Sequence, residues 1–130
     1  LRPRITKNIE NTTFSICFGQ LFSFNSALKL YHWQVTGKGS YSQHMALDEA
    51  IGSLLKLTDS LIETTIGMHN SIEITIPETH TPDDIVKHVQ DFYTYFETQR
   101  ELFSEAFSQS IIDEYQETIQ QLLYKLIRLQ

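Results

Sequence analysis

Residues 40–65 read SYSQHMALDEAIGSLLKLTDSLIETT, and apolar or small side chains recur there every four or three positions. The recurring positions are Leu47, Ile51, Leu54, Thr58, Leu61 and Thr65. Such spacing keeps side chains on one side of an α-helix, as at the a and d positions of a coiled coil. The stretch therefore predicts a long helix, capped by Ser40 or Ser42 and ended near Gly67, whose seam packs into a helical bundle.

Beside that seam, the same stretch carries His44, Asp48, Asp59 and Glu63. At about 100° per residue, these positions fall at about 0°, 40°, 60° and 100° around the helix, so they share one face. Asp48 and Asp59 nevertheless lie about 16 Å apart along the axis, at about 1.5 Å rise per residue. The two carboxylates are too far apart to bind one metal ion, so one copy of the helix cannot complete a site.

A second copy of the helix, packed antiparallel about a two-fold axis, completes the site. Asp48 then faces Asp59 of the other copy, and His44 faces Glu63, because both pairs are centred on the same point beside Gly52. A two-fold contact is self-complementary, so it makes two equivalent sites per dimer. The spacing therefore predicts a homo-oligomer.

His32 is a fifth candidate ligand, and it lies on the helix that precedes this stretch. Two imidazoles and three carboxylates form a ligand set suited to iron or another divalent transition metal. The ligand types alone leave open zinc or manganese binding without redox chemistry. The Glu-x-x-His motif of bundles that hold two irons inside one subunit is absent, which favours a site at an interface.

The run Tyr31 to Val35, YHWQV, followed by His44, Asp48 and the Asp59–Glu63 pair, resembles the ferroxidase signature of the Dps family of mini-ferritins. The resemblance covers most of the chain. It implies a ferritin-like bundle and an iron site shared across a two-fold subunit interface. His32, His44 and Asp48 would come from one subunit, and Asp59 and Glu63 from its neighbour.

The same resemblance implies a role for each side chain. Asp48 and Glu63 would be the central carboxylates, His32 would hold the first iron, and His44 would serve a second, looser position. Trp33 would sit beside the site and donate an electron or confine reactive intermediates, with simple packing as the alternative.

By resemblance, the reaction is the oxidation of Fe(II) by hydrogen peroxide or dioxygen, followed by storage of ferric mineral in a shell of 12 subunits. Such a protein would protect its host against oxidative damage. The alternative is a non-catalytic Dps-like structural or interaction protein, for example a virion component. The short connection after the second helix is similar to that of a less-studied Dps-like branch from bacteria, phages or large viruses.

The rest of the chain predicts an all-α, ferritin-like four-helix bundle with a crossover between the second and third helices. The first helix covers about 11–36 and the crossover 68–80, where alternating isoleucines indicate extended backbone. Thr81, Pro82 and Asp84 predict the start of a third helix that runs to about Phe107. Ser110 with Asp113 predicts a capping box that opens the last helix. We expect residues 1–8 to form a flexible arm and residues 9–130 to form the bundle domain.

Composition limits the function classes. The chain has 130 residues, 41% of them hydrophobic, which fits one globular domain. A net charge of −6 argues against a general nucleic-acid surface, and only Arg2, Arg4 and Lys7 offer a weak DNA contact. No apolar run is long enough to span a membrane and no signal-peptide pattern occurs, so we expect a cytoplasmic protein.

The cysteine and the three remaining histidines are not predicted to take part in the site. Cys17 lies in an apolar helical run and reads as a small core side chain. His69, His80 and His88 have no ligand-like neighbours at helical spacing, so we expect them on the surface.

Overall fold

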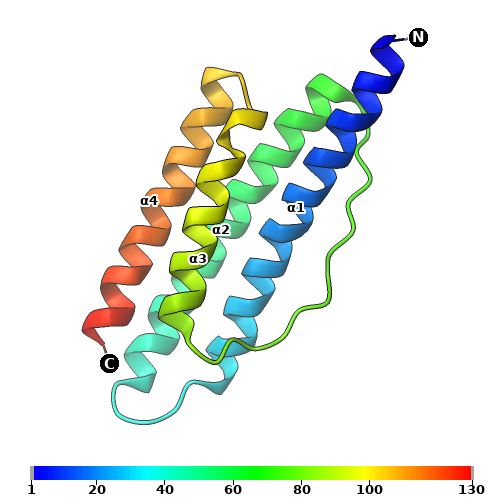
Figure 1. The fold of residues 1–130 in the computed structure, drawn as a ribbon. Helices are drawn as coiled ribbons and strands as arrows, with labels where there is room; N and C mark the ends of the chain where they lie inside the picture. The colour runs from blue at the N-terminus through cyan, green and yellow to red at the C-terminus, as the bar shows by residue number, and fades with distance from the viewer. Residues whose placement is uncertain (1, 130) are drawn as a thin grey trace.

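The computed structural model describes the backbone of residues 2–129 and the side chains of residues 11–129. Within this part the chain is all-helical and contains no strand. The four helices are α1 (Arg2–Gln34), α2 (Ser40–His69), α3 (Ile85–Gln99) and α4 (Ala106–Arg128), and a short 3₁₀ helix, η1 (Arg100–Leu102), follows α3 (Figure 1). The predicted all-α bundle is therefore confirmed. Helix α1 begins at Arg2 rather than near residue 11 and ends at Gln34. The side chains of the predicted arm, with Arg2, Arg4 and Lys7, lie outside the described residues.

The helices pack side by side as one bundle (Figure 1). α2 contacts α1 and α4, while α3 contacts α4 and α1. Residues 70–84 contain no helix and run beside α1 between the end of α2 and the start of α3 (Figure 1). The Ser23 and Thr79 hydroxyls are 2.8 Å apart, and Gly19 lies against the Thr75 carbonyl so closely that a Cβ would collide with it. The connection is thus held on α1 by packing and a side-chain hydrogen bond.

The core follows the seam predicted on α2. All six seam positions are buried: Leu47, Ile51, Leu54, Thr58, Leu61 and Thr65. The two threonines are tolerated there because their hydroxyls donate to the Leu54 and Leu61 carbonyls, at 2.9 and 2.7 Å. Cys17 is fully buried as predicted, and burial raises the pKa of its thiol to about 12.

Both ends of α2 differ from the prediction. The N-cap is Gly39, with φ of 80°, rather than Ser40 or Ser42. A Cβ at Gly39 would lie 2.6 Å from the Leu129 carbonyl oxygen, so close packing of the chain end requires glycine there. Helix α2 also continues past Gly67 to His69, and Asn70 ends it with φ of 66°.

Helix α3 begins near the predicted place with a different cap. Asp84 is itself the N-cap, and its Oδ1 accepts a hydrogen bond of 3.0 Å from the Lys87 backbone N–H. Thr81 and Pro82 therefore precede the helix instead of forming its cap and first position.

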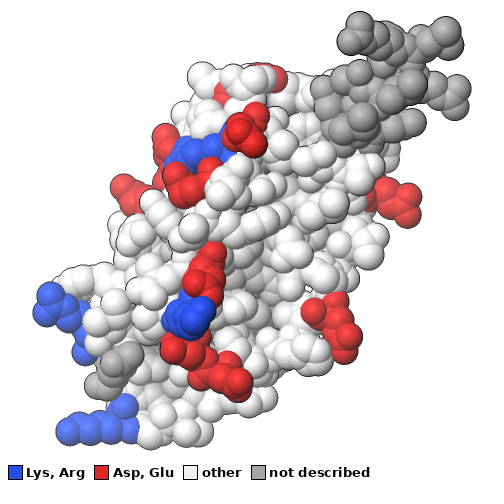
Figure 2. Space-filling model, viewed as in Figure 1, with Lys and Arg blue, Asp and Glu red and all other residues white. Residues whose placement is uncertain are grey.

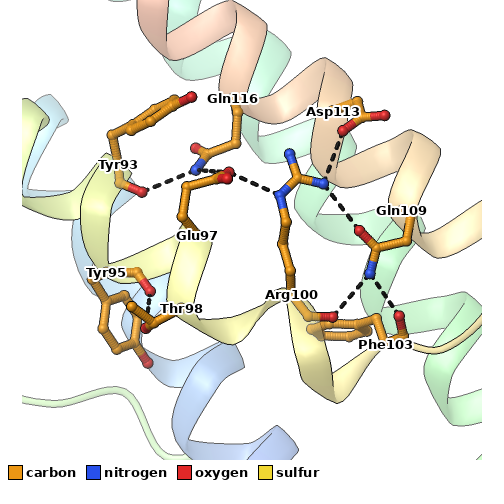
Figure 3. A network of polar contacts seen from close by, with 9 residues as sticks. All are labelled: Tyr93, Tyr95, Glu97, Thr98, Arg100, Phe103, Gln109, Asp113 and Gln116. Atoms are coloured by element: carbon orange, nitrogen blue, oxygen red, sulfur yellow. Dashed lines mark hydrogen bonds and ion pairs between the residues drawn. The ribbon is translucent and has the colours of Figure 1, made fainter.

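The predicted boundary between the last two helices is wrong. α3 ends at Gln99 rather than near Phe107, and Ser110 lies inside α4 rather than at its cap. Figure 3 shows the cause: Gln109 Nε2 donates to the backbone carbonyls of Arg100 and Phe103, at 2.9 and 2.6 Å. Arg100 Nη1 lies 2.8 Å from Asp113 Oδ1, so this carboxylate binds a guanidinium instead of serving a capping box. The break depends on contacts that Arg100 of η1 and the following Phe103 make with α4.

Charged side chains are distributed without a broad basic area in the view of Figure 2, where those over the middle and upper part form mixed clusters. The ion pair of Lys87 with Asp91, at 2.7 Å, is one example. Across the described residues, no helix is long and apolar enough to cross a membrane.

Candidate metal centre

The predicted ligands come from two adjacent helices. His32 lies in the last turn of α1, and the other four lie on α2, with His44 and Asp48 near its start and Asp59 and Glu63 past its middle. Because α1 and α2 pack together through the short turn 35–39, the end of one helix meets the start of the other. This turn brings His32, His44 and Asp48 together.

The two imidazoles form a stacked pair. The ring centroids of His32 and His44 are 3.7 Å apart, and the ring planes are inclined by 27°. His44 Nδ1 is 3.1 Å from the backbone carbonyl oxygen of His32. A carbonyl only accepts, so Nδ1 carries the proton and the Nε2 of a neutral His44 keeps its lone pair. In histidines that ligate a metal through one ring nitrogen, a hydrogen bond from the other ring nitrogen commonly orients the ring.

His32 is buried without hydrogen bonds to its ring. The residue is 4% exposed, and neither ring nitrogen has a hydrogen-bond partner among the described residues. Its Nε2 lies 3.6 Å from Asp48 Oδ1, which is an electrostatic contact beyond hydrogen-bond length. Burial lowers the pKa of His32, the charges of His44 and Lys29 lower it further, and Asp48 opposes them. The ring is therefore held neutral, the state in which an imidazole binds metals.

Lys29 also lies beside His32 and Asp48, although the sequence did not predict it as a residue of the site. Its Nζ is 3.3 Å from Asp48 Oδ1 and 5.7 Å from the centroid of the Trp33 ring. Trp33 itself is 65% exposed, so it is not a core packing residue within one chain. The available signal was the position of Lys29, one helical turn before His32.

Asp59 and Glu63 are exposed on α2 and do not join this group. Within the described part of a single chain, no set of three or more His, Cys, Asp or Glu side chains is placed to hold a metal ion. The structure thus brings together three of the five predicted ligands, and it leaves Asp59 and Glu63 apart from them.

The face of α2 that carries these carboxylates also exposes apolar side chains. Tyr41, Met45 and Leu55 are 74%, 48% and 39% exposed. At Gly52, on the same face, a Cβ would have no atom within 4 Å. This face is therefore open, partly apolar and indented at its centre.

The prediction that His69, His80 and His88 lie on the surface is correct only for His80, because His69 and His88 are half-buried. His80 is exposed, but the half-buried His88 stacks on Phe24 at 5.6 Å between centroids, and His69 lies 5.1 Å from the Phe14 ring. His69 also borders a cavity of about 360 Å³ at the opposite end of the bundle from His32. Aromatic neighbours on α1, which helical spacing does not reveal, explain the burial.

Residues 32–126 match DUF5856, a family of unknown function. The match covers more than half of the 130 residues, so the chain belongs to this family. The matched range begins at His32 and includes all five predicted ligands. No curated protein matches the chain, and no solved structure does.

Proposed function

We propose that this member of DUF5856 is a ferroxidase, which binds Fe(II) as its substrate at sites shared between two copies of the chain and oxidises it with hydrogen peroxide or dioxygen. The observation that carries the proposal is the buried imidazole of His32, stacked on His44 and facing Asp48 on an exposed helix face.

The donor atoms suit such a metal. An imidazole nitrogen that is buried without a hydrogen-bond partner costs free energy, and a metal ion bound to the lone pair of His32 would compensate that cost. His44 offers Nε2, and Asp48 adds a carboxylate that is half exposed and therefore reachable. Imidazole and carboxylate ligands accept Fe(II), and the negative charge of the carboxylates stabilises Fe(III).

A second copy would supply the missing ligands. In an antiparallel α2 pair centred between Ser53 and Leu54, Asp48 faces Asp59 of the other copy, and His44 faces Glu63. Each dimer then has two sites, each with two imidazoles and three carboxylates.

The same two-fold axis would also bring apolar surface on this face of α2 into contact. Gly52 faces Leu55 of the other copy, so the exposed leucine would cover the open space at the glycine. Apolar contacts thus coincide with the arrangement that completes the metal sites, which supports a dimer through α2.

The reaction follows from the ligand set and from the resemblance to Dps mini-ferritins. Each Fe(II) gives up one electron, and hydrogen peroxide takes two electrons and two protons to form two water molecules. We assign the central carboxylates to Asp48 and Glu63, the first iron to His32 and the second to His44. Trp33, the only tryptophan in the chain, is adjacent to His32 and would supply the second electron where a single Fe(II) reacts with the peroxide.

Dimers of this kind would assemble further. We propose the ferritin-like arrangement, with residues 70–84 as the crossover between α2 and α3, and a cytoplasmic shell of 12 subunits that stores ferric mineral and limits oxidative damage. An acidic chain suits this task, because carboxylates attract cations.

Anaerobic addition of Fe(II) followed by hydrogen peroxide tests the activity. The wild-type protein should give a rise in ferric absorbance faster than buffer, whereas Asp48→Asn and Glu63→Gln should each slow it by at least about tenfold. Glu114→Gln, which removes an exposed carboxylate from α4, is the matched control and should leave the rate unchanged. A wild-type rate equal to that of buffer would instead favour a structural or interaction protein.

Trp33 has a separate test. Trp33→Phe should retain metal binding and slow only the oxidation step, because the indole is not among the proposed ligands. Equal oxidation rates for this variant and the wild type would remove Trp33 from the mechanism.

A further inference from the structure

The side chain of Lys29 lies at the carboxylate on which the proposed site depends. Its Nζ is 3.3 Å from Asp48 Oδ1, and the same oxygen is 3.6 Å from His32 Nε2. One oxygen atom therefore faces both an ammonium group and the imidazole that would hold the first metal ion.

The Lys29 ammonium group and a metal ion would compete for Asp48 Oδ1. An ammonium group has three N–H donors and no lone pair, so it cannot ligate a metal. A divalent cation bound between His32 and Asp48 would also be repelled by a positive charge within a few ångströms. The metal must therefore displace Lys29 from Asp48 or bind more weakly beside it.

Lys29 has an alternative position close by. Its Nζ already lies 5.7 Å from the centroid of the Trp33 ring, and its side chain is 37% exposed. The face of an indole attracts an ammonium group, and the flexible stem can also carry the charge into water. Displacement from Asp48 thus requires no rearrangement of α1.

We propose that Lys29 is a competing cation of the metal site: it pairs with Asp48 in the metal-free protein, and a divalent metal ion replaces it. This inference rests on the proposed metal site and adds a determinant of its affinity. Lys29 would weaken metal binding while it keeps the Asp48 carboxylate paired in the empty protein.

The test is a titration of the metal-free protein with Co(II) in a buffer without peroxide. Co(II) binds the same ligand types as Fe(II) and is not oxidised under these conditions. Binding is followed by calorimetry and by the emission of Trp33, the only tryptophan. Lys29→Leu and Lys29→Gln should both bind Co(II) about tenfold more tightly than the wild type, which corresponds to about 1.4 kcal/mol.

Two control variants separate this effect from a general change in charge. Lys29→Arg keeps the positive charge at the site, and Lys56→Leu removes one from an exposed position of α2. Both should bind Co(II) within about twofold of the wild type by the same titration. In the wild type, Co(II) should change the Trp33 emission, and in Lys29→Leu the starting emission should already differ.

The outcomes distinguish this inference from the proposed function. If the wild type binds Co(II) and both neutral Lys29 variants bind it equally or more weakly, Lys29 only positions Asp48 and the competition is wrong, while the metal site stands. If the neutral variants bind and the wild type does not, the competition is supported in its strongest form. If neither binds, both proposals fail.

Discussion

The imidazole rings of His32 and His44 stack across the contact between α1 and α2, with their centroids 3.7 Å apart. The stack joins the last turn of one helix to the first turns of the next, and Asp48 lies beside it at 3.6 Å from His32 Nε2. This arrangement costs the folded chain free energy, because it buries the two ring nitrogens of His32 without hydrogen bonds. Such a cost is typical of sites shaped for a ligand rather than for stability.

Replacing the buried imidazole should therefore separate stability from metal binding. We expect His32→Leu to abolish Co(II) binding and to raise the free energy of unfolding of the metal-free protein by about 1 kcal/mol, since a buried polar group without a partner costs about 1–3 kcal/mol. Urea unfolding measures the change. Leu28 is fully buried, and Leu28→Ala serves as the comparison. Its free energy of unfolding should fall by about 2–5 kcal/mol. A comparable loss for His32→Leu would mean that the ring has a structural role.

The open face of α2 allows a matched test of the dimer. Gly52 and Gly67 both lie inside α2, and a Cβ at either position would meet no atom within 4 Å of its own chain. Gly52→Gln should keep the helical content and weaken dimerisation by at least about tenfold in sedimentation velocity, because Gly52 lies near the centre of a two-fold contact. Gly67→Gln, near the end of the helix, should leave the association unchanged. Equal behaviour of the two variants would remove α2 as the interface.

His88 predicts a dependence of stability on pH. Its ring stacks on Phe24, its Nε2 is buried without a hydrogen-bond partner, and burial lowers its pKa below 6.5, with Asp91 acting in the opposite direction. A lowered pKa means that the unfolded chain binds the proton more readily. The contribution to the free energy of unfolding is complete above pH 6.5 and falls as the pH drops from there toward the native pKa.

The measurement is a set of thermal unfolding curves between about pH 5 and pH 8, the range in which histidines titrate. His88→Gln should reduce the loss of stability on acidification, whereas His80→Gln should not, because the side chain of His80 is 80% exposed. An unchanged pH profile for His88→Gln would show that its burial has no cost to the native state.

The turn between α3 and α4 depends on Gln109. Its amide donates to the Arg100 and Phe103 carbonyls and its oxygen accepts from Arg100 Nη1, as in Figure 3. Gln109→Ala should lower the free energy of unfolding by about 1–3 kcal/mol, since the carbonyl of the buried Phe103 loses its side-chain donor, while the Arg100 carbonyl keeps the Phe103 backbone N–H. Gln120→Ala, on the exposed side of α4, should change it by less than about 0.5 kcal/mol. A similar effect of the two variants in urea would contradict this role.

The helices were predictable where local periodicity sets them, and not where tertiary contacts do. The 4-3 spacing from Leu47 to Thr65 predicted the buried side of α2, because a helix repeats every 3.6 residues. The break after Gln99 was not predictable, because Arg100 and Gln109 form it across two helices.

The candidate site shows the same limit. The resemblance to Dps mini-ferritins predicted that His32, His44 and Asp48 belong together, and they lie side by side. The stack of the two rings and the pairing of Lys29 with Asp48 join α1 to α2, so helical spacing places Lys29 near His32 but does not reveal these contacts.

The shared site is tested most directly by mixing two defective variants. In the proposed dimer, Asp48→Ala and Glu63→Ala would each damage both sites, but a mixed dimer would keep one intact site, formed by the His32, His44 and Asp48 half of one copy and the Asp59 and Glu63 half of the other. After co-refolding at equal amounts, random pairing predicts bound Co(II) at about one quarter of the wild-type level per chain, while each variant alone binds almost none. A mixture that binds no more than the separate variants would contradict a metal site shared between two copies.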